Sequence, residues 1–298
     1  NRTPTPVIDN EGHIIAMLAG QPKSTPDSSA KGKKAYSEAI EEVTSLFDRL
    51  QNLLPPIRSV LTWLPKGRLP RRGLYHAATT GISYGGGQQS PQSLAIPKIY
   101  QPAVKSILEN EGMGRIAGFQ WASFKLFSPK IHGIYEHYLD MLYAEYPEQK
   151  RPWKSSKMPA CTFNLGPGTA TYPHKDAANL AWGWCFVTAL GHFDHVKGGH
   201  IVLWELGLVI EFPAGSTALI PSAVVTHSNA GVQEGEIRYS FTSYAAAGLF
   251  SWVYNGFRSD ADISNDPAVS QKEKEDRAEE RRSRWKEALK LWPHLYSL

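Results

Sequence analysis

The spacing of apolar and polar residues changes character near residue 160. Before that point it predicts a hairpin over 6–18 and helices over 37–54, 101–110 and 129–145. After it, short apolar runs between glycine and proline turns predict strands at about 161–166, 183–190, 199–204, 207–212, 215–220, 223–228 and 236–247. The pattern closes with a strongly charged helix over 267–291.

Seven short strands at this rhythm are typical of a sandwich or jelly roll. We therefore predict an α+β fold, in which a double-stranded β-helix of the jelly-roll, cupin-like kind is flanked by helices. We expect a single domain over 1–298. Its hairpin and helices, 1–158, would pack on a β core over 159–258, and the charged helix would occupy 259–298.

Composition and charge indicate the kind of partner and the cellular compartment, but they do not indicate a specific function. The formal net charge is +4, which favours an anionic partner only mildly. Cys161 and Cys185 lie in apolar, strand-like runs, which indicates a reducing compartment rather than a disulfide scaffold. We expect no membrane partner, since no apolar run reaches the length of a membrane span. We also expect a monomer. The chain begins at Asn1 rather than Met, which indicates a piece excised from a longer protein.

Three residues form a pattern with chemical meaning. His174 and Asp176 are two apart, so in an extended segment both side chains point to one side. His227 lies far downstream, after a β-branched run that would hold it rigidly. Two imidazoles and one carboxylate form the facial triad that binds non-haem Fe(II) and leaves half of its coordination sphere open. We predict that these three residues bind iron.

A second His-x-Asp motif, His192 and Asp194, competes for the same role. In a double-stranded β-helix several strands separate the motif from the distal histidine, each needing about five residues and a turn. The segment from Asp176 to His227 has room for about four such strands, whereas the segment from Asp194 has room for only two or three. The first motif is therefore the preferred ligand pair.

A candidate anion site follows the distal histidine. Arg238 and Ser240 alternate onto the same face of a predicted strand. A guanidinium fork beside a hydroxyl suits a buried carboxylate, which the fork can bind through two hydrogen bonds. His200, which opens an apolar strand after two glycines, is a further candidate contact for the same ligand, although an ordinary strand-end histidine fits it almost as well.

These motifs resemble the TET/JBP family of Fe(II)/2-oxoglutarate-dependent dioxygenases, over about residues 160–248. The similar segments are His-x-Asp-x-x-Asn, ending at Asn179, and Arg-x-Ser followed by Tyr244 six residues after the arginine. The resemblance implies that Arg238, Ser240 and His200 bind 2-oxoglutarate. It also implies that Asn179 and Tyr244 contact a methylated base flipped out of DNA, with O2 as cosubstrate and a nuclear location.

The early hairpin and the glycine-rich stretch near residue 85 also resemble fungal members of this family. The chain departs from the animal enzymes, because it lacks a cysteine-rich zinc region and has a short spacer before the distal histidine. In addition, Ala246 stands where the animal enzymes have a histidine that contacts the base. These departures leave both 5-methylcytosine and N6-methyladenine open as substrates.

If double-stranded DNA is the partner, the protein needs groups that contact the phosphate backbone. A proline- and glycine-rich loop carries a basic cluster, and a glycine run is followed by two glutamines that could probe a groove. The predicted DNA contacts are Lys66, Arg68, Arg71, Arg72, Gln88 and Gln89. A solvated basic loop and a flexible turn are the ordinary alternatives for the two segments.

The sequence therefore predicts oxidation of methylated DNA bases, and two rivals stay open. A 2-oxoglutarate oxygenase could use the same metal site on a protein or a small molecule. A non-catalytic, cupin-like module could hold a metal in the same cluster without turnover.

Overall fold

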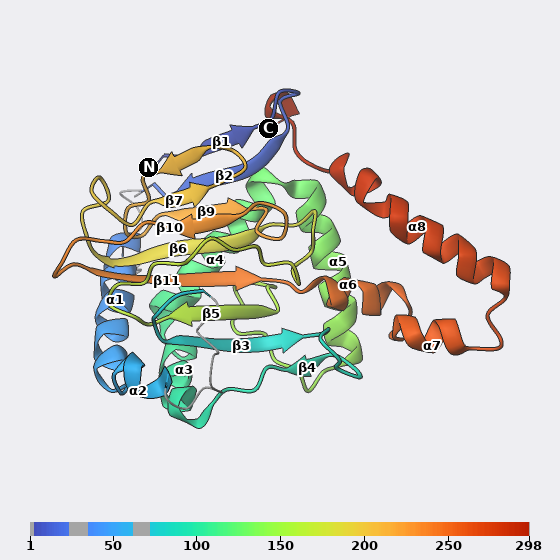
Figure 1. Ribbon diagram of the computed structural model, residues 1–298, viewed down its shortest axis with the longest axis horizontal. Coiled ribbons are helices and arrows are strands. Elements are labelled where there is room, and N and C mark those ends of the chain that lie inside the picture. Colours follow the sequence, from blue (N-terminus) through green and yellow to red (C-terminus); the bar gives the residue numbers. More distant parts are fainter. Residues whose placement is uncertain (1–2, 24–34, 62–71, 298) are drawn as a thin grey trace.

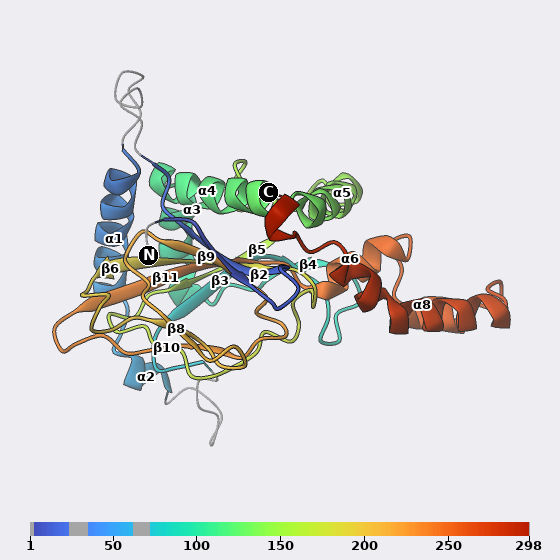
Figure 2. The same cartoon turned by 90° about the horizontal axis from the view of Figure 1, so that it is seen from above.

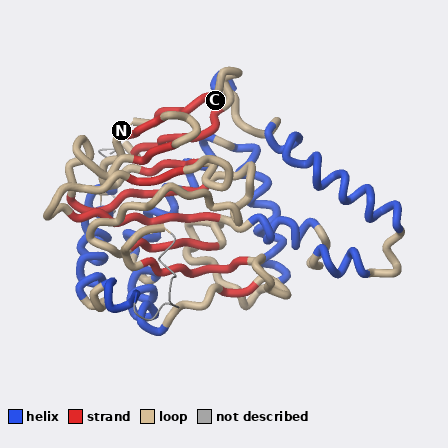
Figure 3. Tube along the Cα trace, in the orientation of Figure 1, coloured by secondary structure: helices blue, strands red, loops and turns tan. Residues whose placement is uncertain are grey.

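The computed structural model describes residues 3–23, 35–61 and 72–297. Its centre is a major antiparallel sheet of eight strands (Figures 1 and 3). In spatial order these are β1 (Thr5–Ile8), β2 (Ile14–Gly20), β9 (Thr217–Ile220), β6 (Cys185–His192), β11 (Ile237–Tyr244), β5 (Ala160–Asn164), β3 (Ala77–Ser83) and β4 (Gln92–Ser93). A minor antiparallel sheet contains β10 (His227–Asn229), β7 (Ile201–Leu203) and β8 (Leu208–Ile210).

Helices α1 (Tyr36–Asn52), α4 (Glu111–Phe127) and α5 (Pro129–Glu145) lie on the opposite side of the major sheet from β8 and β10 (Figure 2). The described helical elements are α1 (Tyr36–Asn52), α2 (Ile57–Leu61), η2 (Lys98–Tyr100), α3 (Gln101–Leu108), α4 (Glu111–Phe127), α5 (Pro129–Glu145), α6 (Ala247–Tyr254), α7 (Asp260–Asn265), α8 (Gln271–Leu289) and η3 (Leu295–Ser297). In α1, Val43, Phe47 and Leu50 are buried at helical spacing, which explains how this helix covers the sheet.

Alternation along β11 divides its side chains between two cores. Tyr239 and Phe241 face the helices, where the Tyr239 ring lies 5.7 Å from that of Phe47 on α1. Arg238, Ser240 and Tyr244 therefore point to the other side, toward the minor sheet. A third cluster of apolar residues fills the space between the two sheets: Ala16, Leu18, Ala189, Ile201, Leu203, Phe212, Ala218 and Ile220.

The predicted α+β fold with a jelly-roll core and flanking helices is confirmed. All seven strands predicted after residue 160 are present, as are the early hairpin and all four predicted helices. The last strand ends earlier than predicted, at Tyr244, because α6 begins at Ala247. The sequence pattern did not predict the following elements: α2, η2, α4, α6, α7, η3, β3 and β4. Through β1–β4 the first half of the chain extends the major sheet at both edges.

The charged helix α8 extends away from the sheets (Figure 1). Only Ala288 is buried among its residues. Beyond it the chain returns to the N-terminal hairpin, where the amide of Leu295 donates to the carbonyl of Gly12 at 2.9 Å. In the described part of the chain no helix is both long and apolar enough to span a bilayer.

Candidate active site

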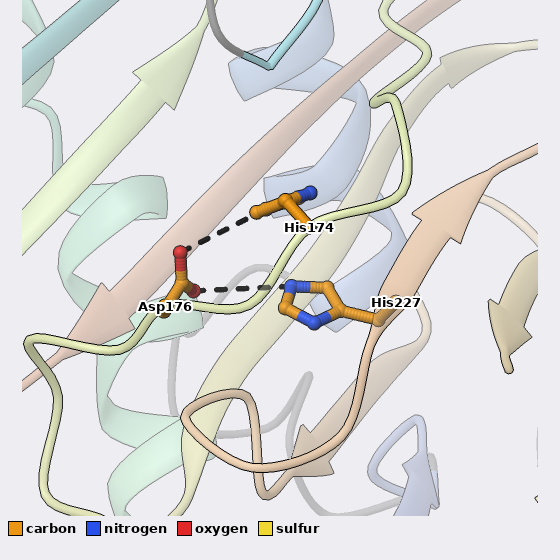
Figure 4. Close-up of side chains that lie close together, drawn as sticks. All are labelled: His174, Asp176 and His227. Carbon is orange, nitrogen blue, oxygen red and sulfur yellow. Dashed lines mark ion pairs between the residues drawn. The ribbon is translucent and has the colours of Figure 1, made fainter. Parts of the chain in front are cut away.

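His174, Asp176 and His227 come together between the two sheets (Figure 4). Their possible ligand atoms all lie within 4.8 Å of one another. The Asp176 carboxylate faces both rings, with Oδ1 at 3.7 Å from His174 Nε2 and Oδ2 at 3.8 Å from His227 Nε2. The exposed fractions of the three side chains are only 10%, 8% and 12%. The structure therefore joins three side chains that the sequence separates by up to about fifty residues.

Backbone pairing sets this geometry. The amide of His174 donates to the carbonyl of His227 at 3.1 Å, and the amide of His227 donates back to the carbonyl of His174 at 3.0 Å. The backbone at His174 therefore forms a single antiparallel bridge to His227 at the start of β10. The amide of Asp176 donates to the carbonyl of Ser222 at 2.8 Å. This bond connects the second ligand of the motif to the segment that precedes β10.

Both histidines present the same nitrogen to the centre. The Nδ1–H of His174 donates to the carbonyl of Tyr172 at 2.7 Å, and that of His227 donates to the carbonyl of Val225 at 3.1 Å. Each Nε2 is therefore the unprotonated nitrogen, aimed at Asp176. Burial lowers the pKa of both imidazoles, and the neighbouring ring of His227 lowers that of His174 further. Neutral imidazoles with a fixed tautomer are the form that binds a metal.

These donors fit Fe(II), because two imidazole nitrogens and one carboxylate form its facial ligand set. Arg72, which the sequence reading assigned to a DNA phosphate, lies at this centre: its Nη2 is 2.5 Å from Asp176 Oδ1. The Arg72 side chain is 38% exposed, so it reaches from the surface into the site. Its assignment to DNA stays a prediction.

The second motif makes no comparable cluster. His192 Nε2 lies 3.5 Å from Glu41 Oε1, and Asp194 Oδ2 lies 3.2 Å from Lys197 Nζ. Within the described ranges, the triad of His174, Asp176 and His227 is the only group of histidine, cysteine and acidic residues close enough to hold a metal. The structure therefore favours the first motif over the second.

Arg238 is a buried cation with free donors. It is fully buried, and its Nη1 donates to the carbonyl of Thr169 at 2.7 Å. Its Nε and Nη2 are buried without a hydrogen-bond partner. Burial lowers the pKa of Arg238 to about 10, which leaves the group charged at neutral pH. A buried charge with unmet donors is costly, so this site is built for an anion such as the distal carboxylate of 2-oxoglutarate.

Ser240 lies two residues from Arg238 on the same face of β11. Its Oγ accepts a hydrogen bond from Asn164 Nδ2 at 2.8 Å, and both residues are buried. The Ser240 hydroxyl hydrogen therefore stays available to the same anion. His200 immediately precedes β7, and its carbonyl accepts a hydrogen bond from the Ala230 amide at 3.0 Å. The role of the His200 side chain in binding 2-oxoglutarate stays a prediction.

A pocket of about 240 Å³ opens beside Asp176 and contains both predicted base contacts. Asn179 Nδ2 donates to Ser222 Oγ at 3.2 Å, and the Tyr244 hydroxyl accepts from Thr162 Oγ1 at 3.4 Å. We call this hollow the metal pocket. Its lining residues are Arg72, Ser83, Asp176, Ala177, Ala178, Asn179, Tyr244 and Ala246.

The remaining predicted DNA contacts lie apart from the triad. Lys66, Arg68 and Arg71 fall outside the described residues. Gln88 and Gln89 follow the glycine run in the loop between β3 and β4, and both line a groove beside this loop. The three preceding glycines have φ values of 137°, 61° and 95°, a backbone that other residues rarely adopt. The roles of both glutamines stay predictions.

Glu205 is a residue that the sequence reading missed. Its carboxylate accepts hydrogen bonds from the amide of Thr226 at 2.6 Å and from Thr226 Oγ1 at 2.7 Å. It also lies 2.9 Å from Lys175 Nζ. These contacts, the hydroxyl first and the ammonium second, lower the pKa of Glu205 to about 2. Since Lys175 separates two ligands and Thr226 precedes the third, Glu205 links the segments that carry the whole triad.

Replacing Glu205 by glutamine should lower metal affinity about tenfold, because the two ligand-bearing segments lose their charged cross-link. Titration of the metal-free protein with Mn(II), followed by electron paramagnetic resonance, measures this directly. Glu211→Gln is the matched control, since it removes another exposed carboxylate from the segment after β8. Equal affinities for the two variants would contradict a positioning role for Glu205.

Comparison with known proteins gives a relationship at the level of the fold. No family model and no curated protein sequence matches the chain. Among solved structures, NgTET1 in complex with 5mC DNA is similar with a TM-score of 0.56 and 15% identity, over 84% of this chain and 79% of that one.

Two further structures match more weakly. An oxidoreductase of the 2OG-Fe(II) oxygenase family from Burkholderia pseudomallei has a TM-score of 0.35 at 18% identity, over 67% of this chain and 77% of that one. OsALKBH1 has a TM-score of 0.32 at 11% identity, over 67% of this chain and 91% of that one. The similarity to NgTET1 shows that this chain shares the fold of that structure, and the His-Asp-His centre of this chain lies within that fold.

Proposed function

We propose that this protein is an Fe(II)/2-oxoglutarate-dependent dioxygenase that oxidises methylated bases in DNA. One observation carries the oxygenase assignment: a facial set of two imidazoles and one carboxylate lies in the same interior as a buried guanidinium with two unmet donors. The choice of DNA is supported by the fold shared with a TET protein bound to 5mC DNA and by the net charge of +4.

Each group of residues has a distinct task in this proposal. His174, Asp176 and His227 hold the iron on one face, while Arg238 and Ser240 bind the distal carboxylate of 2-oxoglutarate. When bound, iron and 2-oxoglutarate supply the oxidising chemistry together with O2. The protein fixes their positions and excludes bulk water, since the triad is nearly buried.

The metal pocket receives the substrate base. A methyl group inside a duplex cannot reach a buried centre, so the base must leave the stack. Asn179 and Tyr244 line the pocket and would orient the base by an amide hydrogen bond and by ring stacking. The products would be 5-hydroxymethylcytosine from 5-methylcytosine, with further oxidation steps, or the demethylated base from N6-methyladenine. A nuclear location and a monomeric state belong to the same proposal.

Mass spectrometry of nucleosides tests the function. The protein is incubated with duplexes that carry 5-methylcytosine or N6-methyladenine, Fe(II), 2-oxoglutarate and O2, and succinate is measured in parallel. We expect loss of the methylated nucleoside and a matching yield of succinate, both absent when 2-oxoglutarate is omitted. Succinate stimulated by a protein or small molecule, with unaltered DNA, would favour the first rival. No succinate with any substrate would favour a non-catalytic metal-binding module.

A further inference from the structure

Three hollows follow one another across the surface, beginning at the metal pocket. The second is a groove of about 460 Å³ beside the glycine loop, which we call the glycine-loop groove. It lies beside the metal pocket without sharing a wall residue with it: Tyr84 of the groove follows Ser83 of the pocket, and Gly248 of the groove lies two residues after Ala246 of the pocket. The third, a hollow of about 140 Å³ between α6, α7 and α8, shares Ser251, Asn255 and Asp260 with the groove. We call it the helix pocket.

The helix pocket is lined by cations from one face of α8. Lys274, Arg277, Arg281 and Arg284 are three or four residues apart, so they form a single stripe on the helix. Against these four cations, Asp260 is the only carboxylate in the pocket lining. The helix as a whole mixes both signs of charge, but its pocket face is therefore strongly basic.

The ion pairs of this stripe are exposed and weak. Arg281 pairs with Asp260, Arg277 Nε lies 3.2 Å from Glu273 Oε1, and Arg284 Nη2 lies 3.9 Å from Glu280 Oε1. Exposed pairs of this kind contribute about 0–1 kcal/mol each, so a phosphate can compete for the same donors.

Two donors are already free for such a competitor. Arg284 Nε is buried without a hydrogen-bond partner, while its guanidinium lies 4.0 Å from the centre of the Tyr254 ring. Lys274 influences the carboxyl of Asp266 electrostatically but forms no ion pair with the residues that the structure describes. The pocket thus combines excess positive charge with unmet donors.

We propose that the helix pocket binds a backbone phosphate of the DNA strand whose flipped base occupies the metal pocket. The glycine-loop groove would hold the nucleotides in between, against polar groups that include Gln88, Gln89 and Asn255. Its charged wall residues are Arg258 and Asp260, one of each sign. This inference rests on the proposed function. Its basis is charge complementarity with a polyanion and the succession of the three hollows, of which the groove and the helix pocket share wall residues.

A double variant with a matched control tests the phosphate site. Lys274→Ala with Arg277→Ala removes two cations from the pocket, whereas Lys272→Ala with Arg282→Ala removes two cations from the same helix outside it. Fluorescence anisotropy with a labelled methylated duplex gives the affinity at several salt concentrations. The pocket variant should bind about tenfold more weakly, and its slope of log affinity against log salt should fall by about two. The control should change less than twofold.

Equal losses in the two double variants would overturn the proposal, because net charge alone would then explain them. Unchanged binding in the pocket variant would overturn it as well. Circular dichroism and Mn(II) titration check that helix α8 and the metal centre persist in each variant. If the unaltered protein oxidises methylated duplex but both variants bind alike, only this inference fails. If the unaltered protein leaves methylated DNA intact, the proposed function fails, and binding to the duplex still tests the pocket.

Discussion

Replacement of Asp176 by alanine is expected to lower Fe(II) affinity by more than about 100-fold and to abolish turnover of 2-oxoglutarate. Asp176 is the carboxylate shared by the centre, since its two oxygens face the Nε2 atoms of His174 and His227 at 3.7 and 3.8 Å. Its loss leaves two neutral imidazoles, which cannot offset the charge of a divalent ion. Calorimetric titration with Mn(II) measures the affinity, and succinate release measures turnover.

Asp194→Ala is the matched control, because it makes the same change in the competing His-x-Asp motif. Asp194 accepts a hydrogen bond from the Val196 amide at 3.1 Å and pairs with Lys197, and it belongs to no candidate metal cluster in the described chain. We expect this variant to keep its metal affinity and turnover. A loss of metal binding in Asp194→Ala, with Asp176→Ala unaffected, would reverse the assignment of the two motifs.

The strands of the second half were predictable because each buries an apolar run between two sharp turns. The elements that escaped prediction lack that signal. β3 (Ala77–Ser83) is built mostly from small residues, including a glycine, and it is a strand because Ala77–Gly81 pair with β5. Helix α4 contains Gly112, Gly114 and Gly118, which weaken its intrinsic helix preference, and tertiary packing over the major sheet overrides this.

The candidate site was predictable where a short motif carries the chemistry, as for His174, Asp176 and the Arg238–Ser240 pair. Groups that act through distant partners gave no such signal. Asn164 donates to Ser240 across 76 residues of sequence, and Arg72 reaches Asp176 across 104. Such contacts follow from strand register and loop packing, which local spacing does not encode. Glu205 belongs to the same class, because only the folded chain brings it to Thr226 and Lys175.

Arg238→Met is expected to raise the KM for 2-oxoglutarate about 100-fold while leaving Mn(II) affinity unchanged. The variant loses the two free guanidinium donors, and two charge-assisted hydrogen bonds are together worth about 3 kcal/mol or more. The metal ligands keep their positions, since neither histidine nor Asp176 bonds to Arg238. Steady-state kinetics with varied 2-oxoglutarate, beside the metal titration, separate the two effects.

The same substitution should stabilise the protein without cosubstrate. Arg238 is fully buried with two unpaired donors, each costing about 1–3 kcal/mol, whereas Met leaves a single buried group unpaired, the Thr169 carbonyl, and gives up a contact at 5.9 Å with the Phe193 ring. The free energy of unfolding of the cofactor-free variant should therefore rise. Arg238→Lys, which keeps a charge but not the planar fork, should raise the KM without this gain. A cofactor-free Arg238→Met protein that melts below the unaltered one, with its KM unchanged, would make Arg238 a structural group and remove the anion site.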